Sequence, residues 1–295
     1  MVMSQSSPFR DYRTERCPKV SVIVSAKNEE RYIGTAIESV LAQTYDNLEL
    51  IIIDDYSDDR TADVARGFRD DRVTVYRKRA EAPGQAASRN IALQIASGSL
   101  IAYQDADDHS DPRRLELQIN EVLAGDKMRV VGTWIEQRFG SSGRIWKLPT
   151  SHEEIVLGFD RLYKRTTIVS GTIVFPRPLA LAAPMRTRFK CFEDWDQLCR
   201  FSEFECVEFR NVPKVLYVYN IRPKGSKGMH DWSRYNIYER ACQARRRAGE
   251  IEWSSIEEFE AYLRNSPRAF LRWEVLRYLL ELKVNIERIR IARAK

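Results

Sequence analysis

The sequence predicts an α/β fold, in which a doubly wound, mainly parallel, Rossmann-like sheet is followed by a C-terminal helical extension. Short runs of β-branched and aliphatic residues alternate with segments whose apolar residues recur at helical spacing. Three of the predicted strands end in acidic or polar residues, at the edge where such sheets bind ligands. Beyond residue 232 nearly every segment has a helical period, which indicates the extension.

The first hundred residues repeat a strand and helix pattern without interruption. The helix expected after the first strand has Ile33, Ile37 and Val40 on one face, and Gly98 stops the last helix of the series. In chain order the expected elements are strand 20–24, helix 33–41, strand 48–53, helix 61–68, strand 73–76, helix 86–96 and a strand ending at residue 104.

The pattern is mixed after Pro112. Ser151 and Glu154 form a capping-box sequence, which predicts a helix start there. The other expected elements are helix 112–124, strand 130–139, turn 140–143, strand 144–148, strand 166–175, helix 193–201 and strand 215–219. With no repeat and no low-complexity linker, we expect one continuous domain over residues 18–220 and an extension over residues 221–295.

Composition excludes several classes of protein. The 295 residues can bury a full core, and the longest apolar runs are far shorter than the roughly 20 residues of a membrane helix. No signal-peptide pattern follows Met1, so a cytoplasmic protein is expected. The five cysteines include no Cys-x-x-Cys pair, which argues against disulfide frameworks and zinc sites.

The charge balance is mildly basic, with 48 basic and 42 acidic residues and a net charge of +6. Most of the excess lies beyond Arg210, where aromatic residues are interleaved. These residues would suit phosphates or an anionic membrane surface, although charge alone favours a solvated helix face. No nucleic-acid partner is expected.

The segment 100–108 is an apolar run that ends abruptly in three carboxylates. Asp105 and Asp107 are two residues apart and can converge on one hard cation such as Mg²⁺ or Mn²⁺. Water and substrate phosphates would supply the remaining ligands. The alternative is a turn, in which Ser110 or Asp111 caps the helix that follows.

Two other strand ends are also polar, at residues 25–29 and 54–58. Neither a Gly-x-Gly-x-x-Gly fingerprint nor a P-loop sequence occurs. The ligand expected at this edge is therefore not held by either of those phosphate-binding loops.

Five segments in this order resemble the family 2 glycosyltransferases of the GT-A fold: residues 20–30, 51–58, 84–90, 105–107 and 193–196. The resemblance covers residues 18–220, with a nucleotide-sugar half at about 18–110 and an acceptor half at about 111–220. It implies an inverting, Mn²⁺- or Mg²⁺-dependent transfer from a nucleotide-diphospho-sugar, by default a UDP-sugar. The implied acceptor is a hydroxyl of a glycan, glycolipid or lipid-linked sugar, in surface polysaccharide synthesis.

The resemblance also implies roles for individual residues. Asp107 would bind the cation, while Asp105 would lie nearer the ribose and sugar and share the cation site. Asp194 matches the catalytic base, although acids at a helix start also complement the helix dipole. The residues expected to bind the base, ribose and diphosphate are Ser25, Ala26, Glu29, Asp54, Asp55 and Arg89.

The segment after residue 219 carries two further candidates. His230 would be an additional metal ligand, because some GT-A enzymes take a histidine from a C-terminal loop; a structural histidine is the alternative. Arg222 partly matches a segment that closes over the diphosphate, but Asn220 and Ile221 interrupt the Tyr-Arg pattern. Trp134 and Trp195 would line a sugar subsite unless they belong to the core.

The apolar and basic stretch 270–295 would contact a membrane peripherally, where lipid-linked acceptors reside. Packing against the catalytic domain or in a homodimer is the alternative. Three other functions are weighed against sugar transfer: a nucleotidyltransferase, a receiver-like signalling domain, and a catalytically silent sugar-nucleotide-binding protein.

Overall fold

The computed structural model describes residues 12–160, 166–222 and 229–266. They form two compact units: the first is Met1–Met185 with Gln197–Pro223, and the second is Arg186–Asp196 with Lys224–Lys295. One boundary falls inside helix α7 (Glu193–Phe201), between Asp196 and Gln197. The other two boundaries fall between Met185 and Arg186 and between Pro223 and Lys224.

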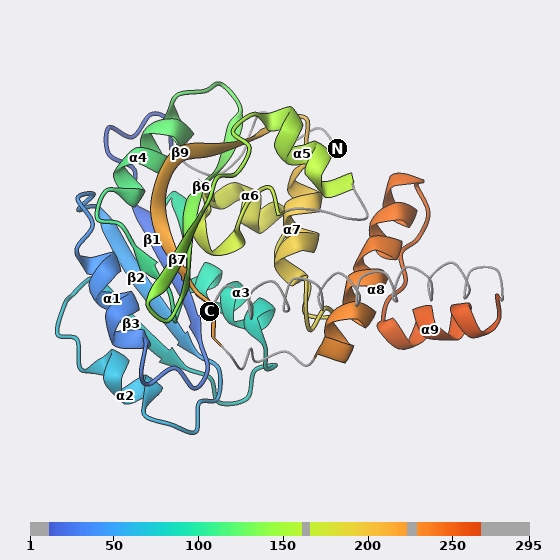
Figure 1. Ribbon diagram of the computed structural model, residues 1–295, viewed down its shortest axis with the longest axis horizontal. Helices are drawn as coiled ribbons and strands as arrows, with labels where there is room; N and C mark the ends of the chain where they lie inside the picture. Colours follow the sequence, from blue (N-terminus) through green and yellow to red (C-terminus); the bar gives the residue numbers. More distant parts are fainter. Residues whose placement is uncertain (1–11, 161–165, 223–228, 267–295) are drawn as a thin grey trace. The chain divides into compact units, whose positions relative to one another are not determined.

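A nine-stranded sheet forms the centre of the first unit, as counted over the described residues (Figure 1). Its strand order is β3-β2-β1-β4-β8-β6-β9-β5, and β7 pairs with β6. The strands are β1 (Val20–Ala26), β2 (Leu48–Asp54), β3 (Val73–Arg77), β4 (Leu100–Asp105), β5 (His109–Ser110), β6 (Met128–Phe139), β7 (Ser142–Trp146), β8 (Val174–Pro176) and β9 (Val207–Asn220).

The parallel half of this sheet comprises β3, β2, β1 and β4. Strand β8 runs antiparallel to β4 and β6, and β6 pairs with β9 in parallel. The expected α/β class with a mainly parallel sheet is confirmed. Since the carboxyl ends of β1, β2 and β4 share one edge, the loops after them can build one site.

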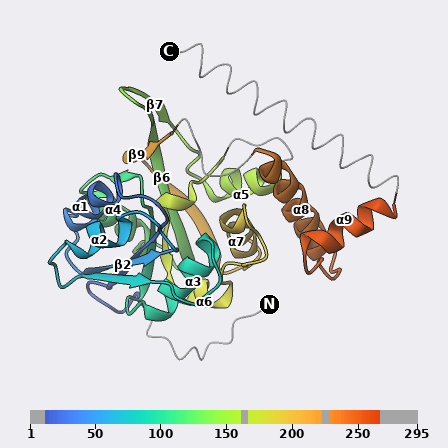
Figure 2. The same cartoon turned by 90° about the horizontal axis from the view of Figure 1, so that it is seen from below.

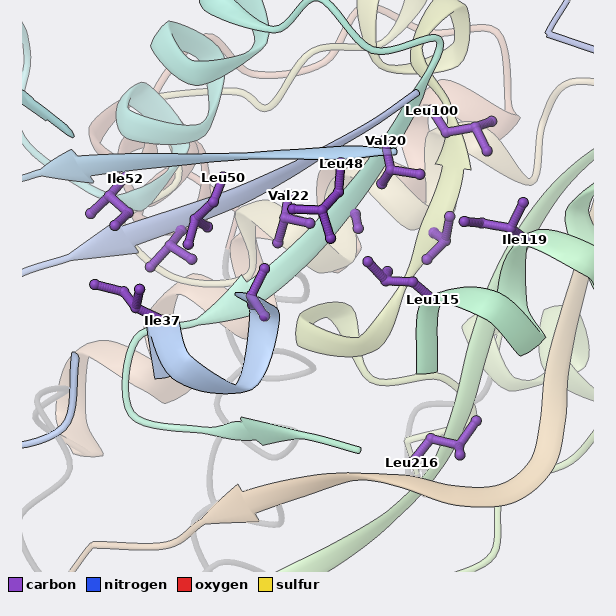
Figure 3. Close-up of a cluster of buried hydrophobic side chains, with 14 of the residues drawn as sticks. Val20, Val22, Ile37, Leu48, Leu50, Ile52, Leu100, Leu115, Ile119 and Leu216 are labelled. Atoms are coloured by element: carbon purple, nitrogen blue, oxygen red, sulfur yellow. The ribbon is translucent and has the colours of Figure 1, made fainter. Parts of the chain in front are cut away.

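Helices cover both faces of the parallel half. The helices of the first unit are α1 (Ile33–Leu41), α2 (Thr61–Arg66), α3 (Gln85–Ile95), α4 (Arg114–Leu123), α5 (His152–Asp160) and α6 (Arg177–Ala182). Helices α1, α2 and α4 pack with alternate residues of β1 and β2 in one apolar core, whereas α3 packs on the opposite face (Figure 2). In Figure 3, Val22 and Leu50 of adjacent strands lie in this core together with Ile37 of α1.

One expectation for local structure was wrong over most of its length. The strand expected at 166–175 is instead a 3₁₀ turn, Ser170–Thr172, followed by the short strand β8. A Cβ atom on Gly171 would lie 2.5 Å from an Asp105 carboxylate oxygen, so only glycine lets the backbone pass this close to that side chain. Strand β5 lies in the acidic segment for which a turn was the alternative, and the strand expected at 215–219 is confirmed as the end of the longer β9.

The second unit contains the start of α7 together with α8 (Met229–Arg247) and α9 (Ile256–Arg264). Its apolar core gathers Phe189, Tyr238, Trp253 and Phe259. The expected helical period beyond residue 232 is confirmed for α8 and α9, while stretch 270–295 lies outside the described residues. Within the described ranges, no helix combines the length and apolarity needed to cross a bilayer.

Candidate functional site

Strand register brings the predicted strand-end residues together. Ser25 of β1 lies beside Asp105 of β4, and Ala26 lies beside Asp54 of β2. The pairing extends past the strand, because the Asp55 amide donates a 2.8 Å hydrogen bond to the Ala26 carbonyl. Four residues predicted from separate motifs therefore form one continuous row at the carboxyl edge of the sheet.

The loops after β1 and β2 are tied to each other by side chains. The Asn28 amide donates to Ser57 Oγ at 2.9 Å, and the Glu29 amide donates to Thr61 Oγ1 at 2.7 Å. Asn28 and Tyr56 both adopt positive φ angles, 57° and 59°, which turn the chain sharply after each strand. These contacts fix the backbone that carries Glu29.

The two acids after β2 have different surroundings. Asp55 is paired with the buried Lys78 Nζ at 2.8 Å and accepts from the Gly84 amide at 2.8 Å, so it holds the loop that leads into α3. Asp54 is fully buried and lies 3.2 Å from Arg77 Nε. Its Oδ1 is buried and accepts no hydrogen bond from the described residues, which is unusual for a buried carboxylate.

Asp105 is held by an arginine on α3. Arg89 Nη2 lies 3.0 Å from Asp105 Oδ1, and the Arg89 side chain is 1% exposed. The guanidinium also lies 4.2 Å from the centre of the Tyr103 ring and donates to Ser170 Oγ. Arg89, which we expected near a diphosphate, is therefore a buried partner of Asp105.

Asp107 and Glu29 share a second arginine. Arg222 Nη2 lies 2.7 Å from Asp107 Oδ2, and the same guanidinium donates to both carboxylate oxygens of Glu29 at 2.8 and 2.9 Å. Burial raises the pKa of Glu29; the negative charge of Asp107 adds to this effect and the Arg222 hydrogen bond opposes it. The structure thus gathers three predicted residues from three distant segments.

Asn220 explains how Arg222 reaches this position. The Asn220 backbone amide donates to Asp108 Oδ1 at 2.8 Å, and its side-chain amide donates to the Asp107 carbonyl at 2.6 Å. Burial raises the pKa of Asp108 well above its ordinary value, and the charges of Asp105 and Asp107 raise it further. The sequence showed Asn220 only as an interruption of a motif, since its partners lie more than 110 residues away.

Arg114 is a second residue that the sequence did not reveal. It is fully buried on α4, where it donates to the Tyr103 carbonyl at 3.0 Å and to Gln104 Oε1 at 3.2 Å. The Tyr217 ring lies 5.4 Å away, and burial lowers the pKa of Arg114 to about 10. Arg114 therefore holds the end of β4 through hydrogen bonds to Tyr103 and Gln104. The sequence showed no sign of this, because an arginine on a predicted amphipathic helix is usually exposed to solvent.

Asp194 and His230 belong to the second unit. Asp194 is half-buried in the first turn of α7, and its Oδ1 accepts from the Trp195 amide at 2.7 Å. His230 is on helix α8 rather than in a loop, which corrects the expected local structure; its side chain lies outside the described set. Of the two candidate subsite aromatics, Trp134 donates to the Leu148 carbonyl at 2.8 Å and is half-buried.

No group of three or more histidine, cysteine, aspartate or glutamate side chains is arranged to hold a metal within the part of the chain that the structure describes. The two predicted cation ligands, Asp105 and Asp107, lie at the end of strand β4 on the carboxyl edge, each beside an arginine. Their oxygens suit a hard cation that takes its remaining ligands from substrate and water.

Comparison with known proteins identifies the family. The family model described as glycosyl transferase family 2 matches residues 21–179. An Escherichia coli relative, the UDP-Glc:α-D-GlcNAc-diphosphoundecaprenol β-1,3-glucosyltransferase WfgD, is 33% identical over 160 residues, covering 54% of this chain and 61% of that enzyme. The match thus spans less than two thirds of that relative.

Two solved structures are similar in fold. TarS of S. aureus in complex with UDP-GlcNAc has a TM-score of 0.60 at 19% identity, over 76% of this chain and 66% of that chain. A Pyrobaculum calidifontis mannosyltransferase in complex with GDP-Man and Mn²⁺ has a TM-score of 0.57 at 18% identity, over 92% and 77%. The fold is GT-A, and the chain is a glycosyltransferase that belongs to family 2.

Proposed function

We propose that this enzyme transfers a sugar, with inversion, from a nucleotide-diphospho-sugar to an acceptor hydroxyl, with UDP as the default nucleotide and Mn²⁺ or Mg²⁺ as the cation. The observation that carries the proposal is the pair of acids, Asp105 and Asp107, at the end of strand β4 on the carboxyl edge of the sheet. There, Asp107 is paired with a partly exposed arginine while Asp105 is paired with a buried one.

The donor assignment is supported by what similar proteins bind. The E. coli relative is named for UDP-Glc, and the two structures similar in fold are complexes with UDP-GlcNAc and with GDP-Man. In this chain the buried Asp54 Oδ1 is an acceptor that an N–H of a base or a ribose hydroxyl would satisfy. Ser25, Ala26 and Glu29 line the same edge, so we assign the base and ribose to them and to Asp54, and leave Asp55 as a nucleotide contact to be tested.

Asp107 is the proposed principal cation ligand, with Asp105 beside it. Carboxylate oxygens suit Mn²⁺ and Mg²⁺, and Asp107 can exchange its arginine for another cation because that pair is partly exposed to solvent. When bound, the cation would offset the negative charge that develops on the departing nucleoside diphosphate. His230 remains a proposed additional ligand.

Asp194 is the proposed catalytic base. The acceptor oxygen would attack the anomeric carbon as the bond from that carbon to the phosphate oxygen breaks, and the hydroxyl proton would pass to an Asp194 carboxylate oxygen. The nucleoside diphosphate would leave on the opposite face, which gives inversion. Arg222, released from Asp107, would pair with the phosphates.

A lipid-linked sugar is the acceptor class we favour, because the E. coli relative is named for a GlcNAc-diphosphoundecaprenol acceptor. Peripheral membrane contact through residues 270–295 and a homodimer remain predictions of the sequence. Flotation of the full chain with anionic liposomes tests the first, and recovery of the protein only in the bottom fraction would oppose it.

The decisive experiment is a thermal-shift screen of nucleotide-sugars with and without Mn²⁺, followed by a transfer assay with the donor that stabilises the protein. A ligand at about 100 times its Kd should add roughly 2.7 kcal/mol to the unfolding free energy. Release of UDP with formation of a glycosylated acceptor supports the proposal. A stabilising donor that is never consumed would instead indicate a silent binding protein, and pyrophosphate release from a nucleoside triphosphate would indicate a nucleotidyltransferase.

A matched pair of variants tests the base. Asp194→Asn should lower transfer by about 100- to 10,000-fold without changing donor binding, because it removes only the group that accepts the proton. Asp71→Asn, an exposed turn residue, is the control and should leave transfer unchanged. Full activity in Asp194→Asn would remove Asp194 from the mechanism.

A further inference from the structure

The first turn of α7, which carries Asp194, is anchored through Asp196. Asp196 is fully buried two residues after Asp194, and Arg186 Nε lies 3.6 Å from one of its carboxylate oxygens. Arg246 Nη1, on helix α8, lies 3.7 Å from the other oxygen. One buried carboxylate is thus held between two arginines from distant parts of the sequence, all inside the second unit.

Glu252 closes these contacts into a ring. It pairs with Arg186 Nη1 at 2.6 Å through one oxygen and with Arg246 Nη1 at 3.0 Å through the other. Arg188 joins the first of these oxygens as well. Asp196, Arg186, Glu252 and Arg246 therefore form a closed cycle of alternating charge, which we call the α7 charge ring.

The backbone that enters α7 is strained at this point. Phe192 has a φ of 67°, a left-handed conformation that aromatic residues rarely adopt, and its carbonyl accepts from the Asp196 amide at 2.8 Å. Such a conformation persists only where the surroundings enforce it. The α7 charge ring attaches directly to the residue that closes this strained turn.

Folding of the second unit offers no sufficient reason for the ring. The apolar cluster of Phe189, Tyr238, Trp253 and Phe259 already joins the segments of that unit. Buried ion pairs often contribute little net stability compared with apolar residues of similar volume, but they specify one arrangement. The ring therefore has the properties of an orienting device rather than a stabilising one.

We infer that Arg186, Arg246 and Glu252 are positioning residues that hold the first turn of α7, and with it Asp194, in the orientation required for proton removal. This inference rests on the proposed function, in which Asp194 is the base. It makes residues of α8 and of the segment before α9 part of the catalytic apparatus.

Steady-state kinetics of the full chain test the inference. Arg246→Met and Glu252→Gln should each lower kcat about 10- to 100-fold with little change in donor KM, because a displaced base affects the chemical step more than donor binding. Arg246→Lys, which keeps the charge, should recover part of the loss. Arg245→Met is the matched control: this adjacent residue stacks on Trp253 and pairs with Glu250, and its loss should leave kcat unchanged.

A second measurement does not depend on catalysis. Backbone amide exchange at residues 192–197 should become faster in Arg246→Met and in Glu252→Gln, but not in Arg245→Met. Equal exchange in all three variants would overturn the inference even if Asp194 is the base. Faster exchange in the two ring variants would show that the ring restrains this turn. If Asp194→Asn were fully active as well, the proposed base would be refuted, and with it the catalytic role of the ring.

Discussion

Two acids only two residues apart, Asp105 and Asp107, are each paired with an arginine, and the two arginines differ in burial. Arg89 is 1% exposed and packs against Tyr103, whereas Arg222 is 32% exposed and follows a strand end; the acids themselves are similarly exposed, Asp105 at 26% and Asp107 at 20%. A buried arginine cannot leave its acid without becoming an uncompensated buried charge, but a partly exposed arginine can be replaced by solvent ions. We therefore expect Asp105 to keep its ion pair with Arg89 and Asp107 to exchange its ion pair with Arg222 for a bound cation.

The two arginines are also held in place by different kinds of contact. Arg89 lies on α3, and the packing of that helix on β1 and β2 fixes its position. Arg222 depends on the Asn220 hydrogen bonds to the Asp107–Asp108 turn. Four predictions, from the largest effect to the smallest, test whether one pair is structural and the other exchangeable.

Removing the charge of the exchangeable acid should have the largest effect. Asp107→Asn should lower transfer by about 100- to 1,000-fold, because a neutral amide holds a divalent cation poorly and the leaving group then lacks its counter-charge. The measurement is the initial rate of UDP release at saturating donor and Mn²⁺. Near-normal rates would show that Asp107 is not the cation ligand, and the distinction between an exchangeable Asp107 and a permanently paired Asp105 would then fail.

Removing the buried arginine should chiefly affect stability. Arg89→Met should reduce the free energy of unfolding by about 3 kcal/mol, since Asp105 loses its partner in a partly enclosed position. Urea denaturation followed by circular dichroism measures the change. A loss below about 1 kcal/mol would show that the Arg89 pair is no more structural than a surface pair.

Removing the exposed arginine should change two affinities in opposite directions. Arg222→Met should bind Mn²⁺ alone at least about fivefold more tightly, because the competing positive charge is gone. It should also bind the UDP-sugar about tenfold more weakly, because a charge-assisted contact to phosphate is lost. Isothermal titration of each ligand measures both, with Arg222→Lys as the charge-preserving control; affinities that move together would contradict an exchange of partners.

The smallest effect is expected for stability in that same variant. Arg222→Met should change the unfolding free energy by less than about 1 kcal/mol, as exposed ion pairs usually do. The measurement is the urea titration used for Arg89→Met. A loss as large as that of Arg89→Met would make the two pairs equivalent.

The elements of the first hundred residues could be predicted because local signals and tertiary packing agree there. Parallel strands buried on both faces appear as continuous apolar runs, and α1 has a clear apolar stripe. Local signals and tertiary packing disagree at residues 166–175, where the predicted strand was wrong. The β-branched residues of this segment favour a strand, but the backbone at Gly171 passes close to the Asp105 side chain. The short β5 was missed because two residues carry no periodicity.

The site was partly predictable for the same reason. The strand-end residues Ser25, Ala26, Asp54 and Asp105 meet because parallel register puts strand ends together. Asn220, Arg114 and the α7 charge ring were not foreseen, since each consists of contacts between distant segments. Arginine and asparagine on predicted helices or loops give no sign that they are buried.

The sequence by itself determined the fold class, the family and the acids that stand at the strand ends, because apolar periodicity and ordered motifs are local properties of the chain. Tertiary structure decided which arginine each acid meets and how deeply each pair is buried. Exposure and partner choice depend on long-range packing, and these two properties separate the supporting acid Asp105 from the exchangeable acid Asp107.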